Sequence, residues 1–248
     1  MLSPMSEDQL GSILGRLSKG CHLMPHSASL CRFLIACFIL SGSLSVRADD
    51  GPPRFRLLTE PEMTPAQREL AQNIRSGPRA SVVGSAANAS ATSLGSPFNV
   101  FLRSPELGEH LQRTGAYIRF KSVLGPKLTE LAILITARHW TAQYEWHAHH
   151  RLALQAGLSP EIAAAIAQGK VPTGMSEDEA LVVRFCTELH QNKKVSDSAF
   201  EAVKQRFGEQ GAMDLIAVNG YYVLVAMVLN VDRTPIPGGA PLPLPVLK

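Results

Sequence analysis

The chain has 248 residues, of which 45% are apolar and 18% charged, and its formal net charge is +3 at pH 7. That apolar content can supply a sizeable core, so disorder is not the default expectation. Residues 1–48 hold four of the basic and two of the acidic residues, which leaves 20 basic against 19 acidic residues in the rest. Residues 49–248 are therefore nearly neutral, and this balance does not indicate binding to nucleic acid or to an anionic membrane surface.

The first 48 residues have the pattern of a signal peptide. Arg32 precedes the apolar run 33–40, and Val46-Arg47-Ala48 places small residues before a cleavage site after Ala48. The polar stretch ahead of the run is long for a signal peptide, so Met24 is an alternative start. Residues 34–37 also resemble a lipoprotein cleavage box, although the apolar run before that cysteine is very short. Because the run falls well below the ~20 residues of a membrane span, we expect a periplasmic or secreted protein without a stable membrane anchor.

The placement of the cysteines bounds the redox chemistry. Cys21, Cys31 and Cys37 lie in the predicted signal peptide, which leaves Cys186 alone in the mature chain. A disulfide or an intrachain dithiol needs two cysteines, so neither is expected. Cys186 follows Phe185 inside a predicted helix, and this position favours an inert, buried packing residue.

Capping signals predict a series of helices. Thr64 is a good N-cap, Pro65 suits the first helical position and Gln67 completes a capping box, so a helix is expected over 65–76. Similar signals predict helices at 105–113 or beyond, 159–169, 176–191 and 196–207. We find no alternating β pattern and no internal repeat, and the expected fold class is therefore all-α.

The segment 128–155 contains neither glycine nor proline and could form one long helix. Thr141 is a plausible N-cap, however, and we favour a split into helices at 128–140 and 142–156. Residues 78–99 are rich in Ser, Ala, Gly and Asn and are expected to form a long loop. Long loops in compact domains are often functional.

The last predicted helix, 212–231, is apolar almost all round. Such a helix must be buried in a core or in an interface, and contact between subunits is the economical explanation. Residues 234–248 contain five prolines and should form an extended tail. The expected organisation is therefore a signal peptide at 1–48, an extension at 49–63, a helical domain at 64–233 and a tail at 234–248.

Four of the six histidines outside the signal peptide lie between His139 and His150. Glu145 and His149 are four residues apart, so in a helix they share a face and could act as an acid–base pair. The alternative is a purely structural pair. A metal site is a further alternative, but His147, His149 and His150 point in different directions around a helix, and no His-Glu-x-x-His motif is present. No metal is therefore predicted.

Five blocks of sequence carry a resemblance to a known family: 97–107, 128–134, 144–149, Ala153 with 156–158, and 220–222 with 229–230. In order and spacing they resemble the carboxymuconolactone decarboxylase family over about 64–233. The resemblance implies an alkylhydroperoxidase D-like helical bundle that assembles as a homotrimer or homohexamer and requires no cofactor.

One branch of this family uses a glutamate, a Cys-x-x-Cys pair and a histidine. Glu130 matches that glutamate and His149 matches the histidine, but Ala142 and Glu145 occupy the cysteine positions. Thiol peroxidase activity needs a thiolate nucleophile and a resolving thiol. The chain therefore resembles the branch that lacks the redox pair.

The resemblance then implies a lyase that decarboxylates a small carboxylated lactone or ring compound. In this interpretation His149 is the acid, Glu145 is its orienting partner or the base, and Glu130 is a second carboxylate with a raised pKa. The expected apolar wall consists of Phe98, Trp146 and Tyr221, and the substrate carboxylate is expected at Arg103, Arg119 or Arg138. We expect the three catalytic candidates to line one pocket that the loop before Phe98 closes. The alternative is a catalytically silent member that binds a small molecule or assembles.

Overall fold

The computed structural model describes residues 51–247, and the predicted signal peptide lies outside them. Within 51–247 the chain is helical and contains no strand, so the predicted all-α class is confirmed. The helices are α3 (Pro65–Ser76), α4 (Phe98–Phe101), α5 (Pro105–Phe120), α6 (Gly125–His139), α7 (Gln143–Gln155), α8 (Pro160–Ala167), α9 (Glu177–Asn192) and α10 (Asp197–Asp232). Four short 3-10 turns occur in the same part of the chain: η1 (Glu60–Glu62) before α3, η2 (Pro78–Ser81) and η3 (Ala86–Asn88) between α3 and α4, and η4 (Pro237–Gly239) after α10.

Side-chain caps begin α3, α8, α9 and α10, whereas α5, α6 and α7 begin without one. Thr64 Oγ1 accepts a hydrogen bond from the backbone N–H of Gln67, and Ser176 forms the same capping box with Glu179. Each box pairs donors at the helix start that would otherwise have no partner. These local bonds explain why the starts of α3 and α9 could be predicted to within a residue.

The helix break near Thr141 is also present, but its geometry differs from the prediction. Thr141 has a positive φ of 47°, and Ala142 is the residue that precedes α7 as its N-cap. The Thr141 hydroxyl accepts from Arg138 Nη2 at 2.8 Å and caps nothing. The split into α6 and α7 is therefore right and the predicted cap is wrong.

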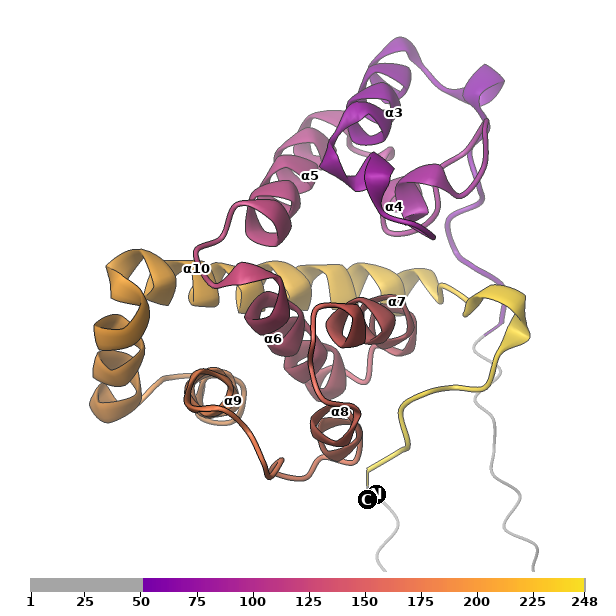
Figure 1. Ribbon diagram of the computed structural model, residues 1–248. Helices are drawn as coiled ribbons and strands as arrows, with labels where there is room; N and C mark the ends of the chain where they lie inside the picture. The colour runs from indigo at the N-terminus through magenta and orange to yellow at the C-terminus, as the bar shows by residue number, and fades with distance from the viewer. Residues whose placement is uncertain (1–50, 248) are drawn as a thin grey trace, which may run out of the picture. The chain divides into compact units, whose positions relative to one another are not determined.

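The central helix of the main core is α6, which contacts α5, α7, α8, α9 and α10. Every residue from Leu128 to Arg138 is buried, as expected for a helix surrounded by other helices. In Figure 1, α10 runs behind α6, while α7 and α8 lie on one side of it and α9 on the other. A smaller apolar cluster joins α3 and α4 with the segment around Leu94.

The two helices predicted at 196–207 and 212–231 are joined into α10, with a kink at Gly208, whose φ is +75°. The part of α10 after Gly208 is only partly buried by the rest of the molecule. Met213, Ile216, Met227 and Val231 are 43–60% exposed, and their spacing places them on one face. By length and composition α10 could cross a membrane, but half of its most apolar window is buried inside the molecule.

The segments before and after the helices are tied to the helical domain. Asp232 accepts hydrogen bonds from the backbone N–H of Phe55 and from the hydroxyl of Ser96. The tail is extended apart from η4, and the backbone of Leu244 exchanges two hydrogen bonds with the side chain of Gln143 on α7. The predicted loop 78–99 contains η2 and η3, and α4 begins at its end.

Candidate active site

The site is centred on a histidine and a glutamate from adjacent helices. His149 Nδ1 on α7 lies 2.7 Å from Glu130 Oε2 on α6, and both side chains are buried. Arg119 Nη2 lies 3.4 Å from the other oxygen, Oε1, of the same carboxylate. Burial alone would raise the pKa of Glu130, but His149 and Arg119 outweigh it and hold that pKa below its ordinary value.

An ionised Glu130 determines the role of the imidazole. Its carboxylate accepts a hydrogen bond from Nδ1–H of His149, so Nε2 is the ring nitrogen that can exchange a proton with a ligand. The Tyr222 ring meets the imidazole edge to face at 5.0 Å and restricts its orientation. A carboxylate on one side and an aromatic ring on the other thus fix His149 in one position.

Glu145 lies one turn before His149 on α7, but the two do not form the expected pair. Both carboxylate oxygens of Glu145 are buried and have no hydrogen-bond partner in the described part of the chain. Burial raises the pKa of Glu145 well above its ordinary value, which favours the protonated, uncharged form of this carboxyl. The expected roles of the glutamates are thus exchanged: Glu130 orients the histidine, and Glu145 is the carboxyl with the raised pKa.

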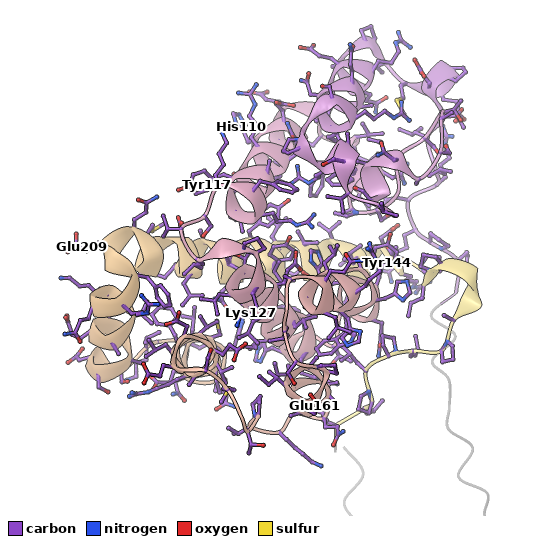
Figure 2. The ribbon with its side chains drawn as sticks, in the orientation of Figure 1. His110, Tyr117, Lys127, Tyr144, Glu161 and Glu209 are labelled. Carbon is purple, nitrogen blue, oxygen red and sulfur yellow. The ribbon has the colours of Figure 1, made fainter. Side chains whose placement is uncertain are left out.

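A cavity of about 90 Å³ borders these residues. Glu145 and His149 line it, together with Phe98 and Tyr221, whereas Glu130 lies behind the imidazole. Residues of the segment 79–97 form one side of this cavity, where the loop was expected. Tyr144 of α7, labelled in Figure 2, also lines the cavity.

Trp146 lies elsewhere. Its side chain belongs to the main core, does not border the cavity and stacks on His150 at 5.8 Å. Successive residues of a helix point about 100° apart, so the neighbour of an inward-facing Glu145 packs in another direction. Phe98 and Tyr221 therefore form the apolar wall, and the other aromatic groups at the cavity are Tyr144 and Tyr222.

Sequence reasoning missed the arginine that is most deeply buried in the cavity wall. Arg79, on η2, is 3% exposed and lies 5.3 Å above the Phe98 ring in a cation–π contact. It forms no ion pair with any carboxylate of residues 51–247; its side chain donates to Gln112 Oε1 at 3.4 Å and forms a hydrogen bond with the Tyr221 side chain. Burial lowers its pKa, but an arginine keeps its charge at neutral pH.

Gly115 on α5 makes room for this arrangement. A Cβ atom at that position would collide with the hydroxyl of Tyr221 and lie 2.6 Å from Arg79 Nη2. The absence of a side chain therefore lets the guanidinium and the phenol meet at the cavity wall. This glycine is the one sequence signal that relates to Arg79, and it is visible only once the helices are packed.

The three arginines proposed for a substrate carboxylate are separated. Arg119 borders the cavity. Arg103 donates to the backbone oxygens of Asn99 and Arg56, and Arg138 borders a different cavity. Only Arg119 of the three is placed beside His149.

The remaining candidates for chemistry are dispersed. His147 is exposed and His150 stacks on Trp146, and no cluster of three metal-ligating side chains occurs within residues 51–247. Cys186 is buried, and burial raises its pKa to about 12. Its sulfur accepts from Asn219 Nδ2 at 3.2 Å, a packing environment in which the thiolate is absent at neutral pH.

Residues 105–186 match the model of the Carboxymuconolactone decarboxylase family. The matched segment includes Glu130, Glu145 and His149, while Arg79, Phe98 and Tyr221 reach the cavity from outside it. No curated protein matches the chain.

Proposed function

We propose that the protein is an exported acid–base lyase of the decarboxylase type, acting on a small carboxylated lactone or ring compound without redox cysteines. The observation that carries the proposal is the Glu130–His149 pair, set 2.7 Å apart beside the buried Glu145 at one cavity. Two carboxyl groups whose pKa values shift in opposite directions are typical of sites that transfer protons.

Arg79 supplies the positive charge for an anionic substrate. Its guanidinium has no carboxylate partner among residues 51–247, and Arg119 lies at the same cavity. Phe98 and Tyr221 provide apolar surface, which disfavours a localised carboxylate relative to a more dispersed charge. As carbon dioxide leaves, the electron pair of the broken C–C bond passes into the ring as a dienolate, whose negative charge the guanidinium stabilises.

His149 then completes the reaction by proton transfer. In the donor form the ring is an imidazolium, with Nδ1–H donating to Glu130, and its Nε2 proton is delivered to the carbon that lost carbon dioxide, which leaves the neutral imidazole. Glu145 carries a second proton at the same cavity and is the reserve donor. The balance is one C–C bond broken, one C–H bond formed, one proton consumed and one carbon dioxide released; solvent restores the proton.

The alternative function is a silent member that binds a small anion without converting it. The cavity, Arg79 and the aromatic wall would serve binding equally well. Peroxidase activity has less support, because Cys186 is buried, carries a pKa of about 12 and has no second cysteine within residues 51–247.

A screen of carboxylated lactones and aromatic acids, read out as carbon dioxide release, tests the proposal. We expect turnover by the wild type, a loss of about 10²–10⁴-fold in His149→Ala, and unchanged turnover in His110→Ala, a control at an exposed histidine labelled in Figure 2. Saturable binding of these acids without any release of carbon dioxide would replace the lyase by the silent binder. Export has its own test, a mature chain that begins at Asp49 in the periplasm or the medium.

A further inference from the structure

A second cavity, of about 450 Å³, shares no lining residue with the cavity at His149. Its walls come from the end of α6, the connection between α8 and α9, the face of α9 and the end of the tail. The volume lies in the range of sites for small organic ligands, about 300–1,000 Å³. Nothing in the proposed reaction uses it.

The lining combines apolar surface with positive charge. Ile135, Ile166 and Val183 provide the apolar part, and Arg138 and Lys170 provide the charge. No aspartate or glutamate lines this cavity among residues 51–247. A neutral ligand would leave both cations without a counter-ion, whereas an anion would pair with them.

Arg138 is a buried cation of the lining whose hydrogen-bond acceptors are all neutral. Its side chain is buried and donates to the backbone oxygens of Ala167 at 3.2 Å and Pro245 at 2.8 Å. These acceptors and the Thr141 hydroxyl are all neutral, and Nε is buried and has no hydrogen-bond partner among residues 51–247. No ion pair to Arg138 occurs within the described part of the chain, so its charge is held in the wall uncompensated, an arrangement that is costly unless an anion is bound.

The histidines at the cavity add no negative charge. The rings of His139 and His190 stack with centroids 4.7 Å apart, and His190 Nε2 lies 3.0 Å from the hydroxyl of Thr136. Burial, together with His139, lowers the pKa of His190 to about 4. At neutral pH this side of the cavity is therefore a flat, uncharged aromatic surface.

The tail leaves apolar surface beside the same cavity. Val246 and Leu247 line it and are 87% and 48% exposed. Exposed aliphatic side chains next to a hollow gain stability when an apolar body covers them. Charge and apolar surface thus meet at one place.

We propose that this second cavity binds a small organic monocarboxylate with an aliphatic chain. The carboxylate lies at Arg138 and Lys170, and the chain lies against Ile135, Ile166 and Leu247. A planar guanidinium matches the geometry of a carboxylate. Only one of the two cations is buried, and this single buried positive charge favours a monocarboxylate over a dianionic phosphate.

The test uses octanoate as the probe and the full chain labelled with ¹³C at isoleucine δ1 methyl groups. We expect octanoate to shift the Ile135 and Ile166 signals saturably, and the neutral isostere octanamide to bind at least about tenfold more weakly. His149→Ala should leave octanoate binding unchanged, which separates this proposal from the proposed function. Equal affinity for octanoate and octanamide, tighter binding of octyl phosphate, or shifts absent from Ile135 and Ile166 would overturn the proposal.

Variants at an exposed residue of the cavity lining test binding without disturbing the fold. Val171 lines the cavity and is 79% exposed, so Val171→Glu should fold normally while placing a negative charge beside the site. We expect it to weaken octanoate binding about fivefold or more, and the matched Val171→Gln to stay within about twofold of the wild type. Equal affinities in the two variants would contradict the proposal. Arg138→Gln should weaken binding further, but it also removes the hydrogen bond to Pro245.

Discussion

The carboxylate of Glu130 lies 2.7 Å from Nδ1 of His149, across the contact between α6 and α7. The two residues are 19 positions apart in the sequence, and the hydrogen bond between them uses Nδ1, the ring nitrogen that faces α6. Glu145, which is closer in sequence, makes no bond to the ring. The helix contact, and not the spacing along α7, therefore selects the partner of the histidine.

Glu130→Gln is expected to lower the rate of carbon dioxide release by about 10²–10⁴-fold, because the amide no longer stabilises a proton on His149. The substrate is the compound that the screen identifies. Glu161→Gln, at an exposed glutamate of α8 labelled in Figure 2, is the matched control and should behave as the wild type. A Glu130→Gln variant with more than about half of the wild-type rate would show that Glu130 has no part in the reaction.

Arg79→Gln is expected to raise KM, or Kd for a silent binder, by about tenfold or more for carboxylated compounds, because it removes a cavity cation that has no carboxylate partner among residues 51–247. Loss of the contact with Phe98 should also destabilise the fold by about 1 kcal/mol. Arg113→Gln, at a side chain that is 73% exposed, is the control. If both variants bind the acid equally well, the anion-binding role of Arg79 is wrong.

The exposed apolar face of α10 leads to a prediction about assembly. Met213, Ile216, Met227 and Val231 remain 43–60% exposed in the single chain, and we expect a second copy to cover them in a homotrimer or homohexamer. Met227→Lys should lower the mass measured by light scattering at micromolar concentration, whereas Leu57→Lys, at a side chain that is 53% exposed, should not. A wild-type monomer would contradict this expectation.

Glu145 should make stability depend on pH. Its pKa is raised in the folded chain above the ordinary value of 4.5, so between these values the folded state holds a proton that the unfolded state has lost. Stability relative to Glu145→Gln should be highest below pH 4.5 and fall by about 1.4 kcal/mol per pH unit as pH rises toward the raised pKa. Urea unfolding at fixed protein concentration measures the difference, and parallel pH profiles for the two proteins would contradict the expectation.

Local signals in the sequence predicted most of the fold. The boxes at Thr64 and Ser176 and the break near Thr141 depend on residues a few positions apart, so they can be recognised without knowledge of the packing. The same local criteria missed the continuity of α10. They predicted two helices because they cannot distinguish a kink at Gly208 from a short loop.

The site was less predictable, because its partners are distant in sequence. Spacing suggested Glu145 for His149, yet the packing of α6 brings Glu130 to the ring and leaves Glu145 in apolar surroundings. Arg79 lies in a loop of small polar residues that carries no periodic pattern, and only the fold of η2 against α5 brings it to the cavity. Trp146 could not be separated from the inward-facing residues of α7 before the orientation of that helix was known.

The central claim is that one carboxyl of the site is ionised to orient His149 while the other carries a proton. A ¹³C NMR titration of labelled glutamate side chains measures this directly, with Glu130→Gln and Glu145→Gln used to assign the two signals. The account predicts that Glu130 ionises below the ordinary value of 4.5 and that Glu145 ionises well above it. If Glu145 ionises near 4.5, or if the order of the two groups is reversed, the proton-transfer site proposed for this protein is wrong.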